Sequence, residues 1–203
     1  MVYFCSMLSK SDKTKQLIIE RSAPIFNTKG YAATSMSDIL EATGMAKGGI
    51  YGNFDSKDEI AAAAFEYAFQ LMRDRLREAI KAEKTAYDKL AAIFRFYKNY
   101  SVQPVVEGGC VLLNTAIDSD DHIPFLKQKA ASGMKEMLDS LRQIIQRGIE
   151  AGEFTASLHA KNEAIHIFSV IEGGIMMSKV LDNPQILNSL LQRLQEHTDN
   201  WRT

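Results

Sequence analysis

The chain has 203 residues, of which 46% are hydrophobic, and its formal net charge is -1 at pH 7. This length and apolar content are enough to bury a substantial core, which excludes an intrinsically disordered protein. Four prolines, twelve glycines and the lack of strongly alternating strand patterns predict helices throughout. We therefore expect an all-α fold.

The charge is distributed unevenly along the chain. Residues 1–57 carry seven lysines or arginines and five aspartates or glutamates, a net charge of +2, whereas the remainder carries -3. This asymmetry is too mild to establish a nucleic-acid partner by itself.

Nothing in the sequence predicts export or a membrane span. Cys5 and Cys110 form no CxxC pair and have no second ligand at metal-binding spacing, which is typical of a reducing compartment. The opening MVYFCSML is short and lacks a basic start, and polar residues interrupt the longest apolar run, 164–181. We expect a cytoplasmic protein without membrane contact.

Residues 34–57 follow a helix predicted over 11–29 and carry the most informative local pattern. Ser35 is a hydroxyl cap in front of a short amphipathic helix, and Gly44 is the left-handed residue that ends it. A second short helix is predicted over 46–53. This order is helix, turn, helix.

The second of these helices contains adjacent glycines, Gly48 and Gly49, after Lys47 and before Tyr51. Each glycine costs roughly 1 kcal/mol relative to alanine in a helix. Small residues let a backbone approach a surface closely, so we infer that something outside the fold needs this space.

The rest of the chain is predicted to be helical as well. A capping box of Ser56 and Glu59 opens a helix over 57–83, which is long enough to connect two domains. Further helices are predicted over 88–100, 110–117, 124–151, 160–181 and 184–197. Because the last two carry more apolar surface than a single core covers, we expect a homodimer built through about 160–181 and 184–200.

The stretch from Lys13 to Ile60 resembles the head of the TetR/AcrR transcriptional regulators. The matching residues keep fixed spacings: Phe26, Lys29, Gly30, Tyr31, Thr34, Ile39, Ala42, Gly44, Lys47, Gly48, Ile50, Tyr51, Phe54, Ser56, Lys57 and Glu59. The resemblance implies a DNA-binding helix-turn-helix domain in residues 1–57 and a larger helical domain for effector binding and dimerisation in residues 58–203.

The resemblance also implies roles for single residues on double-stranded DNA. The helix over 46–53 is expected to lie in the major groove with Ala46, Lys47, Gly48 and Gly49 toward the bases. Phosphate contacts are expected from Thr34, Ser35, Tyr51 and Lys57. From the residues alone, the less favoured alternatives are that Tyr51 is a half-buried core tyrosine and that Lys57 is a solvated lysine in a first helical turn.

A ligand pocket is expected to involve side chains that are spaced to face the interior of the second domain. The candidates are Phe94, Tyr97, Cys110, Leu113, Asn114, Phe168 and Glu172. Plain core packing is the alternative for each of them, and for Cys110 it is favoured over a redox role. Glu172 and His166 fit either a hydrogen bond at a dimer interface or a polar anchor for a ligand.

No catalytic or metal-binding pattern stands out. Asp118, Asp120, Asp121 and His122 do not have calcium-loop spacing, and an exposed loop explains them. No nucleophile, acid and base occur at recognisable spacing, so we expect no enzyme activity, no cofactor and no metal.

The sequence therefore predicts a ligand-responsive repressor that binds a palindromic operator as a homodimer and is released by a small molecule. The alternative is a DNA-binding structural factor that uses the same head and has no small-molecule effector.

Overall fold

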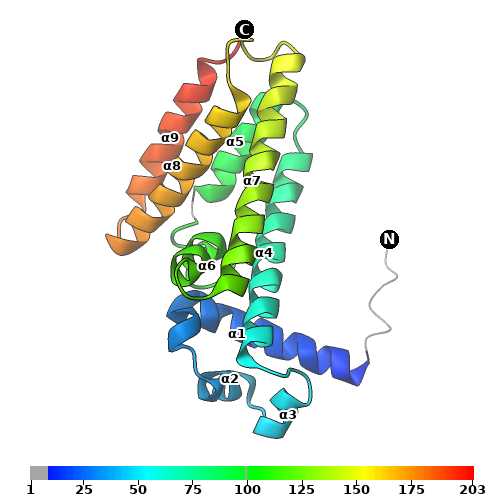
Figure 1. Ribbon diagram of the computed structural model, residues 1–203. Coiled ribbons are helices and arrows are strands. Elements are labelled where there is room, and N and C mark those ends of the chain that lie inside the picture. The colour runs from blue at the N-terminus through cyan, green and yellow to red at the C-terminus, as the bar shows by residue number, and fades with distance from the viewer. Residues whose placement is uncertain (1–8, 99) are drawn as a thin grey trace. The chain divides into compact units, whose positions relative to one another are not determined.

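Helices form the regular secondary structure of residues 9–98 and 100–203, the part of the chain that this computed structural model describes (Figure 1). Within that part, the only strand-like feature is an isolated antiparallel bridge between Phe154 and Arg202. The all-α prediction is confirmed. The helices are α1 (Lys10–Ala33), α2 (Met36–Thr43), α3 (Lys47–Tyr51), α4 (Lys57–Lys81), α5 (Ala86–Tyr97), α6 (Val111–Ser119), α7 (Pro124–Glu150), α8 (Ala160–Val180) and α9 (Gln185–Asp199).

The chain divides into two compact units. The first contains the described residues up to Gln70 together with Val106–Lys129, and the second contains Leu71–Val105 and Ala130–Thr203. The segment Val106–Lys129 thus belongs with the N-terminal helices, although sequence reasoning assigned it to the C-terminal domain. The boundary between functional domains at residues 57 and 58 stays a prediction.

Local sequence signals determine where the helices of the first unit begin and end. Ser9 caps α1 in a reciprocal box with Asp12, and the helical geometry of α1 is interrupted at Gly30, with φ 79° and ψ 168°. Gly44 ends α2 in the left-handed conformation, as predicted. Helix α3 has five residues and is shorter than the predicted 46–53, because two adjacent glycines make a poor helix.

A small apolar core holds α1, α2, α3 and the start of α4 together. Its members are fully or almost fully buried branched and aromatic side chains, packed against partly buried neighbours that include Phe26 and Leu40. This packing leaves one face of each short helix available to solvent. The core residues are Ile18, Ile39, Ile50, Phe54 and Ile60.

Helix α6 is fixed to α1 by side-chain amides. The Asn114 amide nitrogen lies 3.0 Å from both the carbonyl and the side-chain oxygen of Asn27, and 2.9 Å from the Gly108 carbonyl. The Asn27 amide in turn donates to the carbonyls of Glu107, at 2.8 Å, and Gly109, at 3.1 Å. Two interlocked asparagines therefore satisfy the backbone of the turn before α6.

In the second unit, α9 packs against α8 and against α5 (Figure 1). The end of the chain returns to the turn after α7, where Thr155 N–H donates to the Trp201 carbonyl at 2.8 Å. The Trp201 and Phe154 rings meet edge to face with centroids 5.7 Å apart. Both rings are almost completely buried, so the C-terminus is part of the core of this unit.

Replacement of Gly108 by alanine is expected to destabilise the first unit. Gly108 has φ 109°, and a Cβ there would lie 2.6 Å from the backbone oxygen of Asn27, which cannot move without breaking the asparagine network. Gly152→Ala is the comparison, since its φ of 71° is also positive but no neighbour lies within 4 Å of a Cβ there. Thermal unfolding monitored by circular dichroism should show the larger loss for Gly108→Ala. Equal losses would contradict the steric argument.

Candidate functional site

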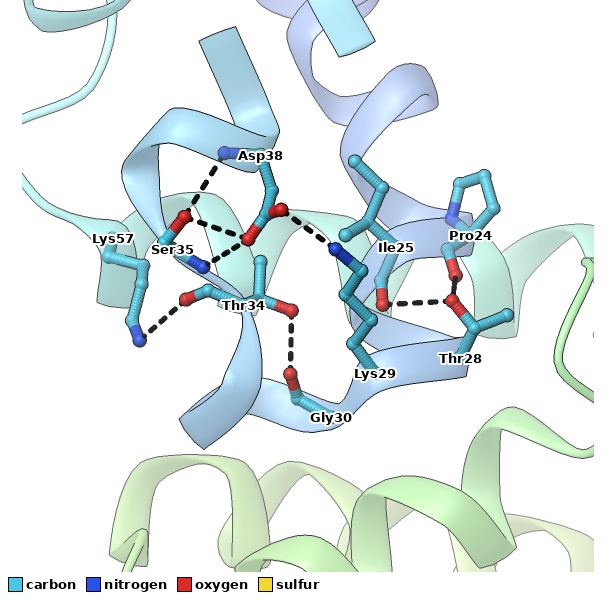
Figure 2. A network of polar contacts seen from close by, with 9 residues as sticks. All are labelled: Pro24, Ile25, Thr28, Lys29, Gly30, Thr34, Ser35, Asp38 and Lys57. Atoms are coloured by element: carbon cyan, nitrogen blue, oxygen red, sulfur yellow. Dashed lines mark hydrogen bonds and ion pairs between the residues drawn. The ribbon is translucent and has the colours of Figure 1, made fainter. Parts of the chain in front are cut away.

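The ammonium group of Lys57 joins three helices of the first unit at one point. From the first turn of α4, its Nζ donates to the carbonyls of Tyr31, at 2.9 Å, and Thr34, at 3.0 Å. It also lies 4.0 Å from the centre of the Tyr31 ring. The carbonyls belong to the end of α1 and the residues before α2, so Lys57 fixes the junction on which α2 depends (Figure 2).

Thr34 contributes to this junction from the inside. Its side chain is 1% exposed, and its hydroxyl donates to the Gly30 carbonyl at 2.6 Å (Figure 2). A buried hydroxyl that is already engaged is not placed to reach a phosphate. The phosphate contact of Thr34 stays a prediction, and the structure shows its hydroxyl bound within the junction.

Ser35 and Asp38 form a capping box at the start of α2. The Ser35 hydroxyl accepts from Asp38 N–H at 3.1 Å, and the Asp38 carboxylate accepts from Ser35 N–H at 2.7 Å (Figure 2). Lys29 of α1 donates to the same carboxylate at 2.7 Å. The Lys29 ammonium, together with the Ser35 donors, holds the pKa of Asp38 well below its usual range. Asp38 thus stays ionised and ties α2 to α1.

Tyr31 completes the connection between α1 and α4. Its hydroxyl donates to the Asp58 carboxylate, and its ring stacks on Phe26 with centroids 6.4 Å apart. Burial, and then the Asp58 carboxylate, raise the pKa of Tyr31 to about 12. The phenol therefore remains a neutral donor at physiological pH.

The outer face of the helix-turn-helix carries the residues predicted to meet DNA. Ala46, Lys47, Gly48 and Tyr51 are exposed, and Gly49 is half-buried. The Tyr51 side chain is 43% exposed, and the Lys47 ammonium lies 5.6 Å from the centre of its ring. Tyr51 is therefore partly exposed and is not a member of the buried core of this unit.

Gly48 has no packing reason to be glycine. A Cβ there would meet nothing within 4 Å, and its φ is not in the left-handed region. Alanine would stabilise the helix by about 1 kcal/mol. The contacts within the fold therefore do not require glycine at this position.

The sequence identified the exposed residues but missed the ones that support them. Lys29 and Asp38 tie α2 to α1, Tyr31 ties α1 to Asp58 of α4, and Asn27 ties α1 to the turn before α6. Only the serine-to-aspartate spacing before α2 was a readable signal. The capping box predicted for Ser56 and Glu59 forms only in part. Glu59 N–H donates to Ser56, but the Glu59 carboxylate accepts from Asp55 N–H.

The predicted pocket residues do not form a single cluster within either unit. Tyr97 and Phe168 line a nearly filled apolar cavity of about 10 Å³ in the second unit, and Phe94 and Glu172 are buried elsewhere in that unit. The remaining three belong to the first unit, where Cys110 is buried just before α6 and Asn114 is bound to Asn27. The third, Leu113, is half-buried on α6. Cys5 lies outside the described residues.

A short second helix with an exposed face, supported by a conventional capped first helix, is the architecture of a helix-turn-helix DNA-binding protein. Two family models match the chain: "Bacterial regulatory proteins, tetR family" over residues 18–64 and "Tetracyclin repressor-like, C-terminal domain" over residues 86–194. The chain belongs to the TetR family of transcriptional regulators. It is accordingly a DNA-binding regulator and not an enzyme.

Similar proteins agree with this assignment along most of the chain. The fatty acid metabolism regulator protein of Bacillus subtilis is 27% identical over 192 residues, covering 93% of this chain and 96% of that one. A TetR transcriptional regulator from Chloroflexus aurantiacus is 33% identical, with a TM-score of 0.92 over 96% of this chain and 98% of the other. The fold is also that of the TetR family regulator CifR, solved with 26-base-pair operator DNA. CifR is 17% identical, with a TM-score of 0.80 over 89% of this chain and 94% of its own.

Across the described residues, none of the helices combines the length and apolar character required to span a bilayer.

The Lys57 ammonium is expected to contribute measurably to the stability of the first unit. Lys57→Met keeps most of the side-chain volume but leaves the Tyr31 and Thr34 carbonyls without this donor, so the free energy of unfolding should fall by about 1–3 kcal/mol. Lys84→Met, an exposed lysine in the second unit, is the control. If both variants melt like the wild type by circular dichroism, Lys57 is only a solvated lysine.

Proposed function

We propose that this regulator represses transcription by binding a palindromic operator as a homodimer through the outer face of α2 and α3. The observation that carries the proposal is that Lys47, Gly48 and Tyr51 are exposed and have no structural task that requires these residue types. Together, the ammonium of Lys47, the uncovered backbone at Gly48 and the phenol of Tyr51 can contact base edges in the major groove and the phosphates beside it.

The residues divide into those that contact DNA and those that position them. Lys47 is the donor to a base edge or phosphate, Tyr51 is a donor to phosphate, and Gly48 allows close approach of the backbone. The Ser35 hydroxyl already donates to the Asp38 carboxylate at 2.8 Å, so Ser35 reaches a phosphate only by exchanging that hydrogen bond. Thr34 and Lys57 act indirectly, because both are committed to holding the α1–α2 junction. Since Lys47 is the only strong donor on this face, sequence choice depends heavily on DNA shape and water.

The dimer is proposed to form through α8 and α9. Large apolar side chains that remain exposed in the monomer gather on and just after α8, which is unusual for a surface helix. They are Ile165 at 45%, Met176 at 44%, Met177 at 37%, Val180 at 75% and Leu181 at 63% exposure. A second copy that covers this face would remove most of that surface from water.

Release by a small molecule is proposed to act through the second unit. Tyr97 and Phe168 border the 10 Å³ cavity with other apolar side chains, and this space is smaller than any organic effector. An effector at this cavity would have to bind an expanded conformation of the second unit. It can shift DNA affinity only by the difference between its affinities for the expanded and the unexpanded conformation.

We propose that this regulator is located in the cytoplasm, where its operator DNA is.

The alternative is a DNA-binding factor without an effector. A panel of small apolar and singly charged molecules, tested for release of operator DNA by fluorescence anisotropy, separates the two. Release that is lost when Tyr97→Trp fills the cavity supports the effector. DNA affinity that no molecule changes supports the alternative.

The DNA contacts are testable with variants that keep the fold. Duplexes selected from a random pool should contain a palindrome, and Lys47→Ala and Tyr51→Phe should weaken binding to it about tenfold each. Loss of the Lys47 contact should also reduce the slope of log affinity against log salt by about 1 if it pairs with a phosphate. Gly48→Ala should melt no lower than the wild type and still bind DNA less tightly.

Lys84→Ala is the control for these measurements, because it removes an exposed lysine from the second unit. The proposed interface is wrong if no palindrome is enriched, or if Lys47→Ala and Tyr51→Phe bind DNA as Lys84→Ala does.

The dimer face is testable independently of DNA. Met176→Glu places a charge at the centre of the exposed apolar surface, and dimers should give way to monomers in analytical ultracentrifugation. Lys84→Glu is the control for added negative charge, because Lys84 is exposed and lies outside α8 and α9, and this variant should stay dimeric. A Met176→Glu protein that sediments as a dimer would exclude this face.

A further inference from the structure

Three metal-binding side chains meet where the beginning of α8 lies beside the end of α9. Their ligand atoms, one from each of Glu163, His166 and His197, all lie within 4.8 Å of one another. The Glu163 carboxylate is 3.0 Å from His197 Nε2 and 3.7 Å from His166 Nδ1. No other group of three such residues occurs in the described part of the chain.

The backbone explains why these side chains converge. Glu163 and His166 are three residues apart in the first turns of α8, so they lie on one face of that helix. This Glu-x-x-His spacing is the one that helical bundles use to hold transition metals. His197 comes from the last turn of α9, which packs against α8.

The ring of His197 is held in place by aromatic neighbours. It meets the Trp201 ring edge to face with centroids 5.2 Å apart, and the His166 ring in the same way at 5.1 Å. Trp201 is 3% exposed and packs against Phe154, so it forms a rigid wall behind His197. Ligands fixed by packing lose little freedom when an ion binds.

The distances fit a four-coordinate ion after a small movement. Tetrahedral zinc, with bonds of about 2.0–2.2 Å, keeps its ligand atoms about 3.3 Å apart. The two contacts of Glu163 already bracket this separation. The side chain of His166 is 48% exposed, so it is free to turn toward His197.

From this geometry we infer a binding site for a divalent transition metal ion of the zinc class, with His166 Nδ1, His197 Nε2 and a Glu163 carboxylate oxygen as ligands. Three protein ligands leave the fourth position for water or another donor. Imidazole with a single carboxylate selects this class over calcium and magnesium, which prefer oxygen ligands throughout. The ion would fasten α8 to α9.

The test uses Co²⁺ as a spectroscopic probe and Zn²⁺ as its competitor on the full-length protein. We expect one Co²⁺ per chain, visible d–d absorption bands, displacement by Zn²⁺, and a rise of Tm with added Zn²⁺. Glu163→Gln keeps the hydrogen-bonding shape but loses the anionic ligand, so Co²⁺ affinity should fall about 100-fold or more. His166→Ala should weaken binding as strongly.

His122→Ala is the matched control, because this histidine belongs to the other unit. His197→Ala removes a packed ring, so its fold is checked by circular dichroism without metal, and the exposed His166 keeps the test decisive if that variant is unstable. The inference is overturned if wild-type protein takes up no Co²⁺ in a saturable way. It is also overturned if Glu163→Gln and His166→Ala bind Co²⁺ as tightly as His122→Ala, since binding would then lie elsewhere.

Discussion

The arrangement of the first unit depends on how the C-terminal end of α1 is satisfied. The last carbonyls of a helix have no intrahelical partner and carry partial negative charge, and α1 has no basic residue in its own last turn. Lys57 supplies the missing cation from α4, at a cost, because the first turn of a helix disfavours positive charge. One ammonium group thereby sets the path of the chain from α1 into α2.

Because Lys57 holds the junction between α1 and α2, the residues that stabilise the first unit differ from those proposed to bind DNA. Thr34, Tyr31 and Asp38 use their polar groups internally, whereas Lys47, Gly48 and Tyr51 give nothing to the fold that other residues could not. Lys47, Gly48 and Tyr51 can therefore change with little effect on stability, whereas Ile50 on the inner face of α3 belongs to the core. A DNA-binding fold can recognise different DNA sequences when its exposed residues can change without loss of the core that supports them.

Local physics made much of the fold predictable, and long-range contacts set the limit. Ser35 and Gly44 mark the ends of α2 through interactions within a few residues, so they were readable from sequence. The hydrogen-bond partners of Lys57 are 23 and 26 residues away in the sequence, and Asn27, a partner of Asn114, is 87 residues away. A periodic pattern of apolar residues carries no information about contacts over such separations. For the same reason the sequence does not predict that Asn114 secures the turn before α6, and its place in a ligand pocket stays a prediction.

In the second unit, polar contacts likewise fix two helices, α8 and α9, relative to each other. At one end, Leu187 N–H donates to the buried Ser178 hydroxyl at 2.9 Å, and at the other end Glu163 meets His197. One turn before Ser178, Gly174 lets α9 approach so closely that a Cβ would lie 2.9 Å from the Leu187 side chain. A helix pair that is held at both ends and closely packed next to its turn has little freedom to slide. The exposed apolar face of α8 is consequently presented in a fixed register, and a partner that recognises it binds without first ordering it.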